Sequence, residues 1–166
     1  MKIKKINEKI WPSGKVEIFQ RKEGEMTWVK IGEEHNLITN AGFQAIGNHL
    51  GGNGAYSATT FKYFAWGDGT TAPAVTRTAA DFYSDCANSD TKLVALVNTF
   101  DVATKTQQWD CYLSSSDNAV ATIKKFALMN ADPGTIMFNE VLFSTPYSKD
   151  STINLYFKYT LTLSQA

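Results

Sequence analysis

The C-terminal stretch STINLYFKYTLTLSQA, residues 151–166, constrains the fold of this chain more than any other feature. Apolar and polar side chains alternate along it. A β-strand points alternate side chains to opposite faces, whereas a helix would scatter the apolar ones around its circumference. We therefore predict a long strand with one face on a hydrophobic core. The predicted inward-facing residues are Ile153, Leu155, Phe157, Tyr159, Leu161 and Leu163. The predicted outward-facing residues are Asn154, Tyr156, Lys158, Thr160 and Thr162.

Upstream, apolar runs come in pairs that are separated by turn residues. Residues 15–39 predict a hairpin through residues 22–25, in which Gly24 supplies the positive φ that tight turns commonly need. Residues 92–100 and 104–113 predict a second hairpin that turns through residues 101–104. Residues 121–130 and 136–144 flank the turn sequence Asp132-Pro133-Gly134, where proline presets φ and glycine tolerates the left-handed region.

Residues 39–52, TNAGFQAIGNHLGG, predict one helix near residues 40–50. Thr39 or Asn40 can cap its N-terminus, and the glycine pair after Leu50 can end it. Its predicted sheet-facing stripe is Phe43, Ile46 and Leu50. Many short strands with one helix predict an all-β fold, an antiparallel β-sandwich of jelly-roll or immunoglobulin-like type. We expect residues 14–166 to form a single domain, preceded by residues 1–13 as an N-terminal arm or a first strand.

The composition argues against two partner classes, nucleic acid and membrane. The 166 residues include 16 Lys and Arg and 16 Asp and Glu, so no cationic surplus exists to neutralise a phosphate backbone, and we expect no nucleic-acid partner. No apolar run approaches the roughly 20 residues that cross a bilayer, and the N-terminus lacks the apolar segment of a secretory signal, so no membrane partner is expected. A disulfide between Cys86 and Cys111 stays open, but without an export signal we favour two buried thiols.

The loop GDGTT, residues 67–71, is the first candidate for chemistry. A Walker-type phosphate loop needs a lysine after its glycines, and here Thr70 to Pro73 follow instead. A calcium loop needs oxygen ligands on alternate residues and a late glutamate. We interpret the stretch as a glycine-rich turn at the end of a strand. The alternative is a calcium ion that Asp68 shares with Asp81 or Asp85, so Asp68 is a weak metal candidate, and we expect no cofactor.

The ionisable residues suggest no enzyme. His35 and His49 have no second histidine at metal-ligand spacing, and Cys86 has no obvious activating neighbour. Glu140 is the only acid in a strongly apolar strand and hence the best candidate for a perturbed carboxyl group. We expect it to accept backbone hydrogen bonds or to face a partner subunit. Catalysis would require Glu140 and His49 to approach a common cleft.

The aromatic residues allow two interpretations. They could line a sugar-binding platform, or they could fill a sandwich core and its interfaces. Tyr156 lies on the predicted outward face of the last strand and is therefore a candidate for contact with a partner. The aromatic residues in question are Trp11, Trp28, Trp66, Trp109, Tyr63, Tyr112 and Tyr156.

Three segments, taken together, resemble small structural proteins of tailed bacteriophages. They are NLITNAGFQAIGNHLGG at residues 36–52, FKYFAWGDGTTAPAVTRTAADF at residues 61–82, and GTIMFNEVLFSTPYSKDSTINLYFKYTLTL at residues 134–163. The resemblance lies in the order of the motifs. A helix entry precedes an aromatic strand that ends in G-x-G-T-T-A-P, and a threonine-rich strand ends the chain. It implies a non-enzymatic component of the virion, which is assembled in the host cytoplasm.

The resemblance leaves the place in the virion open. The first interpretation is a capsid decoration protein that binds the major capsid lattice as a homo-oligomer, with a trimer as one form. The alternatives are a head-fibre, tail or baseplate subunit and, more remotely, a carbohydrate-binding module that uses the tryptophans and Asp68 with calcium. The lysine-rich start could add an extended arm to a neighbour's sheet edge, or it could close this domain's own sheet. The predicted partner-binding residues are Lys2, Lys4, Lys5, Trp11 and Tyr156.

Overall fold

The computed structural model describes residues 10–51, 60–93, 100–117 and 119–165. These residues form antiparallel strands and two short helices, which confirms the all-β prediction. The strands are β1 (Ile10–Lys22), β2 (Val29–Ile38), β3 (Tyr63–Gly67), β4 (Ser89–Leu93), β5 (Thr106–Leu113), β6 (Thr122–Met129), β7 (Met137–Ser148) and β8 (Ile153–Gln165). The helices are α1 (Asn40–Gly51) and α2 (Ala79–Asp85).

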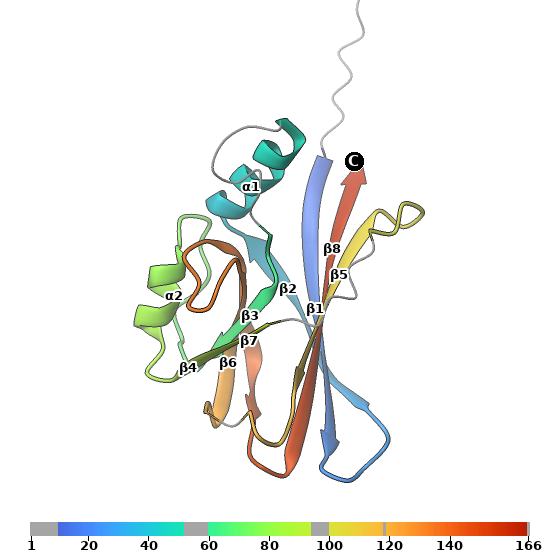
Figure 1. Ribbon diagram of the computed structural model, residues 1–166, viewed down its shortest axis with the longest axis vertical. Coiled ribbons are helices and arrows are strands. Elements are labelled where there is room, and N and C mark those ends of the chain that lie inside the picture. The colour runs from blue at the N-terminus through green and yellow to red at the C-terminus, as the bar shows by residue number, and fades with distance from the viewer. Residues whose placement is uncertain (1–9, 52–59, 94–99, 118, 166) are drawn as a thin grey trace, which may run out of the picture.

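The strands follow the order β4-β3-β6-β7-β2-β1-β8-β5 in one sheet that folds over on itself. β2 and β7 pair only through Leu37 with Glu140 and Ile38 with Asn139, so the sheet bends along this seam. One half contains β5, β8, β1 and β2, and the other contains β7, β6, β3 and β4. Figure 1 shows α2 beside the second half, whereas α1 lies at the upper end of the molecule, above β2 and β3.

The main core lies between the two halves. Phe157 of β8 stacks against Phe126 of β6, with ring centroids 6.1 Å apart, and against Phe143 of β7 at 6.0 Å. Leu155 and Tyr159 are fully buried on the same face of β8. The alternation predicted for β8 is therefore confirmed. Asn154 is the exception on the outward face, because it is buried and donates to Glu23 at 2.8 Å.

A second, smaller core lies beneath α2, a helix that the sequence analysis missed. Thr78 caps it: the Thr78 hydroxyl accepts from the Asp81 amide at 3.3 Å, and the Asp81 carboxylate accepts from the Thr78 amide at 2.8 Å. With seven residues, of which only Ala79 and Phe82 are buried, α2 is too short to show a helical period. The small core consists of Ala65, Ala79, Phe82, Ala127, Met129 and Met137.

The predicted hairpin through Gly24 and the predicted turn at residues 132–134 are confirmed. β1 and β2 pair around a turn in which Gly24 has φ +83°, and β6 and β7 pair around the turn at residues 132–134. For the hairpin predicted at residues 92–113, residues 94–99 of the first strand lie outside the described residues. Its turn exists, because Asp101 and Thr106 form a bridge, and among the described strands β4 pairs with β3 and β5 pairs with β8. Turn residues act locally, whereas the partner of each strand depends on which half of the sheet buries its apolar face.

The helix predicted at residues 40–50 is confirmed as α1, although its packing face differs from the prediction. The Thr39 hydroxyl accepts from the Gly42 amide at 3.1 Å and thus caps the helix. Gly42 and Ala45 are buried, because small residues let α1 approach the backbone of Phe138 closely. Ile46 packs against the main core, but Phe43 lies beside the contact face and is 43% exposed. The Leu50 side chain lies outside the described residues.

The first strand takes up part of the segment that was predicted as an arm or first strand. β1 begins at Ile10, and residues 10–13 pair with residues 162–165 of β8. Residues 1–9, with Lys2, Lys4 and Lys5, lie outside the described residues, and so does the Trp11 side chain. Their proposed contacts with a partner therefore stay predictions.

Candidate functional site

The GDGTT loop packs tightly against α2 and the residue that follows it. A side chain on Gly67 would collide with the Cys86 sulfur, and one on Gly69 would collide with the Asp85 carboxylate. The Thr71 hydroxyl donates to Asp85 at 2.5 Å. The glycines thus serve the close approach of two protein segments, which supports the interpretation as a turn.

Asp68 holds the same loop to the start of β4. Its carboxylate accepts from the Asn88 backbone amide at 3.0 Å and from the Asn88 side-chain amide at 2.7 Å. These hydrogen bonds, with that from the backbone amide as the largest contribution, lower the pKa of Asp68. Asp81 and Asp85 have separate partners, and the described part of the chain contains no group of three or more acidic, histidine or cysteine side chains placed to hold a metal ion.

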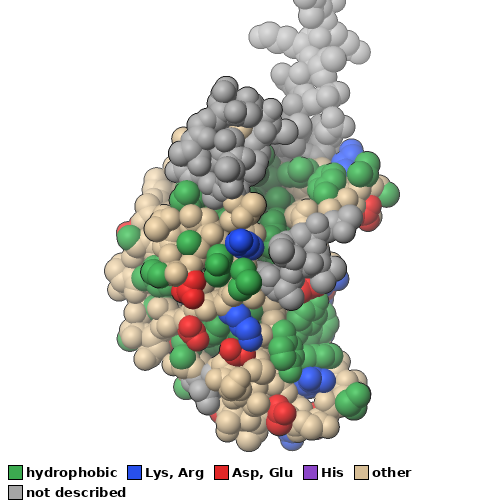
Figure 2. Space-filling view, viewed as in Figure 1, with side chains coloured by type: hydrophobic (Ala, Val, Ile, Leu, Met, Phe, Trp, Pro, Cys, Tyr) green, Lys and Arg blue, Asp and Glu red, His purple; other side chains and the backbone are tan. Residues whose placement is uncertain are grey.

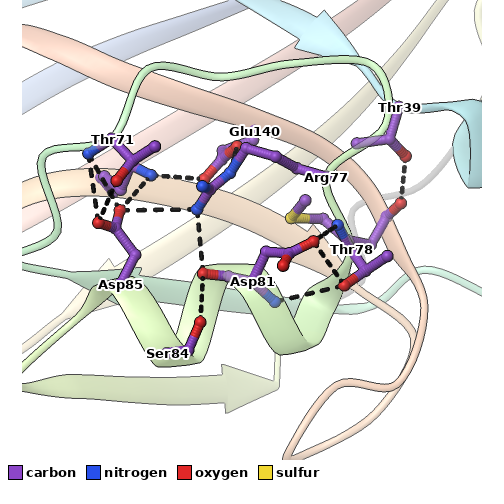
Figure 3. Close-up of polar contacts among 10 residues, drawn as sticks. Thr39, Thr71, Arg77, Thr78, Asp81, Ser84, Asp85 and Glu140 are labelled. Carbon is purple, nitrogen blue, oxygen red and sulfur yellow. Dashed lines mark hydrogen bonds and ion pairs between the residues drawn. The ribbon is translucent and has the colours of Figure 1, made fainter.

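Beneath this loop, four charged side chains form a buried ion-pair cluster (Figure 3). The Lys125 ammonium donates to Glu140 at 2.7 Å and to Asp85 at 2.6 Å. The Arg77 Nε donates to Glu140 at 2.8 Å, and an Arg77 Nη lies 3.6 Å from Asp85. The side chains of Lys125 and Glu140 are both 0% exposed. We call these four residues, Arg77, Asp85, Lys125 and Glu140, the ion-pair cluster.

The charges of this cluster keep one another ionised. Two cations face two carboxylates, so the group is formally neutral. Burial disfavours ionisation of Asp85, but the hydrogen bonds from Lys125 and Thr71 outweigh it and lower the pKa of Asp85 to about 2. General acid–base catalysis needs a pKa near the working pH. Asp85 is therefore a structural anion that binds the loop and α2 to the sheet.

The role predicted for Glu140 is wrong in its partners. Its carboxylate accepts hydrogen bonds from Lys125 and Arg77, and not from backbone amides or a partner subunit. Sequence reasoning missed both cations. A signal existed for Lys125. The alternation along β6 places Lys124 and Lys125 on different faces of the sheet, and β6 pairs with β7, the strand that carries Glu140. Arg77 lies 63 residues from Glu140 in the sequence and gave no such signal.

Of the remaining candidates for nucleophilic chemistry, Cys86 directly follows Asp85 of this cluster, and the His49 side chain lies outside the described residues. His35 is exposed on β2, and the approach of His49 to Glu140 stays untested. Both cysteines are free. Cys111 is buried, as expected, and burial raises the pKa of its thiol to about 12. Cys86 is only half-buried, and burial raises the pKa of its thiol too.

The structure does not bring the aromatic candidates together as one platform. Trp66 is buried in the core. Trp109 stacks on Tyr159 at 5.3 Å, and its indole N–H donates to the Phe61 carbonyl at 2.8 Å. These two tryptophans belong to the sandwich interior, and neither lies on a sugar-binding surface.

Other aromatic residues line a pocket of about 380 Å³ on the β5-β8-β1-β2 half. Trp28 contacts Tyr112 edge-to-face at 5.7 Å and lies 5.9 Å from Tyr156 between ring centroids. The Arg21 guanidinium lies over the Trp28 ring at 4.7 Å and donates to the Tyr112 hydroxyl at 3.1 Å. We call this the aromatic pocket. Its lining residues are Phe19, Arg21, Trp28, Tyr112 and Tyr156.

Tyr156, the predicted partner-contact residue, is half-buried in the wall of this pocket. Its hydroxyl donates to the Asp110 carboxylate at 2.8 Å, and Gln108 donates to the same carboxylate at 2.8 Å. Burial, followed by the hydrogen bond to ionised Asp110, raises the pKa of Tyr156, so its phenol stays protonated at neutral pH. The ring is thus fixed in position, and its contact with a partner stays a prediction.

The exposed charges nearby are paired. The Lys30 ammonium lies 2.7 Å from Glu17 and 2.6 Å from Glu33. Figure 2 likewise shows basic and acidic side chains interspersed over one face of the molecule. This pattern agrees with the equal numbers of acidic and basic residues and gives no extended cationic patch on that face.

No protein-family model matches this chain, and neither the curated proteins nor the solved structures that were compared with it give a match. Among the described helices, none has the length and apolar character needed to cross a membrane.

Proposed function

We propose that this chain is a non-enzymatic structural protein of a bacteriophage virion, a capsid decoration protein that binds the major capsid lattice. The proposal starts from the resemblance of residues 36–163 to small virion proteins. Residues of these motifs have structural roles here: Thr39 caps α1, Gly67 and Gly69 allow close packing, and Thr78 caps α2. Because these motif residues serve capping and packing, a resemblance based on them supports a protein whose role is structural.

The observation that carries the proposal is the ion-pair cluster. The most deeply buried ionisable side chains, Lys125 and Glu140, bind each other and the neighbouring charges, and the cluster is neutral. This arrangement supports a folded domain without a reactive site, whose surface binds other proteins. The form proposed is a homo-oligomer, with a trimer of the 18.4 kDa chain as the first state to test by light scattering.

The test is the location and copy number of the chain in purified phage particles. Quantitative mass spectrometry with labelled peptides gives its ratio to the major capsid protein, and electron cryo-microscopy gives its position. We expect a ratio near that of a lattice component and density at lattice symmetry positions. A few copies at the tail would support the head-fibre, tail or baseplate alternative instead. Absence from purified particles would refute a virion role.

A matched control uses particles from a phage that lacks the gene. Adding the purified chain to these particles should restore the lattice density. Adding it to complete particles should give no further binding, because the sites are already occupied.

A further inference from the structure

We propose that the aromatic pocket is a binding site for a carboxylate-bearing sugar. This inference goes beyond a structural role in the virion and does not depend on it. The pocket volume of about 380 Å³ falls within the range of roughly 300–1,000 Å³ that is typical of small-molecule sites.

The aromatic walls suit the apolar face of a sugar ring. Trp28, Tyr112 and Tyr156 come from three separate segments and meet around one hollow, and Tyr112 is 39% exposed. Aromatic side chains supply large contact area at little conformational cost, and their hydroxyl groups bond the polar edges of a ligand. Because Tyr112 accepts from Arg21, its own hydroxyl proton is available to an acceptor on the ligand.

Arg21 determines the sign of the ligand charge. Among the described residues that line the pocket, Arg21 alone is charged, so a cationic ligand would be repelled. A guanidinium group has five N–H donors, and one of them bonds Tyr112. Its Nε is enclosed and therefore not accessible to a ligand in the pocket, so the carboxylate would have to bind the Nη groups. A planar cation that lines the pocket and keeps Nη donors beyond the one that bonds Tyr112 is suited to a carboxylate, which can accept two parallel hydrogen bonds from it.

The surroundings favour a small ligand over a flat protein partner. A stable protein interface covers about 800 Å² on each side. Next to the pocket, Glu17, Lys30 and Glu33 already pair with one another. A partner surface covering them would have to desolvate these ion pairs, whereas a sugar in the hollow leaves them in water.

The experiment is a calorimetric titration of the full chain with three defined probes. The acidic probes are methyl β-D-glucuronide and N-acetylneuraminic acid, and the neutral probe is methyl β-D-glucoside. We expect at least one acid to bind about tenfold or more tightly than the glucoside, since a hydrogen-bonded charge pair commonly has an effect of this size. The substitution Arg21→Gln should reduce binding of that acid to the level of the glucoside.

Three variants separate the contributions. Arg21→Lys keeps the positive charge but loses the planar pair of N–H donors, so it should recover only part of the preference for the acid. Tyr112→Ala should weaken acid and glucoside alike. Lys15→Gln, on the same strand but outside the pocket lining, is the matched control and should leave binding unchanged. Circular dichroism and the melting temperature show whether each variant is folded.

Several results would overturn the proposal. One is the absence of heat or of chemical-shift change with both acids at millimolar concentration. Another is acid binding that Arg21→Gln leaves intact. A third is an oligomer that dissociates on Tyr112→Ala, because a second copy of the chain would then occupy the pocket. A location of the chain outside the capsid would leave this inference standing, so the two proposals fail independently.

Discussion

Each half of the sheet has one arginine at its candidate site: Arg21 in the aromatic pocket and Arg77 in the ion-pair cluster. The two arginines differ in what surrounds them. Arg77 is 12% exposed and is bonded to Glu140 and to the Asp81 carbonyl. Arg21 faces aromatic rings, and its single side-chain hydrogen bond goes to Tyr112. The comparison teaches that charge in a buried place indicates structure when its partners are complete. Arg21 instead lines an open pocket and keeps side-chain donors beyond the one that bonds Tyr112, which is the basis of the binding proposal.

The largest effect is expected from a substitution that breaks the ion-pair cluster. Glu140→Gln leaves two cations, Lys125 and Arg77, facing the single carboxylate of Asp85, so we expect a loss of about 3–5 kcal/mol in the free energy of unfolding. Urea unfolding followed by fluorescence measures it. The double variant Glu140→Gln, Lys125→Met removes both charges and should recover much of the loss. The matched control, Glu33→Gln at the exposed Lys30 pair, should change stability far less, because solvent screens exposed ion pairs. Equal effects at both sites would contradict the assigned role.

A smaller effect follows the titration of Asp85. Its pKa is about 2 in the folded state and near 3.8 in the unfolded chain, so the folded state binds this proton more weakly. The resulting stabilisation, about 2 kcal/mol, is present above pH 4 and is lost as the pH falls from about 4 to 2. Unfolding measured from pH 6 to pH 2 should show this loss. Asp85→Asn should be less stable at pH 6 and should show a shallower decline, and a parallel decline would exclude Asp85 as its source.

The smallest effect on stability is expected in the aromatic pocket. Arg21→Gln removes a half-exposed side chain with one hydrogen bond, so the free energy of unfolding should change by less than about 1 kcal/mol. The same urea experiment measures it beside Glu140→Gln. A loss as large as that of Glu140→Gln would make Arg21 a structural residue and would remove the contrast between the two regions.

The sequence supported predictions wherever the chain acts locally. The alternation at residues 153–163 predicted β8, the turn residues around Gly24 predicted the hairpin of β1 and β2, and Asp132-Pro133-Gly134 predicted a turn; the structure confirms all three. GDGTT was interpreted as a turn because no lysine follows its glycines. Helix α2 was missed, since its seven residues bury only Ala79 and Phe82.

Neither site could be assembled from the sequence, because both join distant segments. Arg21 and Tyr112 are 91 residues apart, and Lys125 and Asp85 are 40 apart. Turn and periodicity signals do not report which strands become neighbours. The pocket depends on β1 and β5 both pairing with β8, and the sequence predicted a different partner for β5.

The neutrality of the ion-pair cluster has a consequence for the environments that the protein can withstand. Dissolved ions weaken the attraction between solvent-exposed charges, but they act far less on charges sealed inside a protein. A rise in ionic strength should therefore weaken the exposed pairs around Lys30 while leaving Lys125 and Glu140 nearly unaffected. The attachment of α2 to the sheet is in this sense insulated from the salinity of its surroundings.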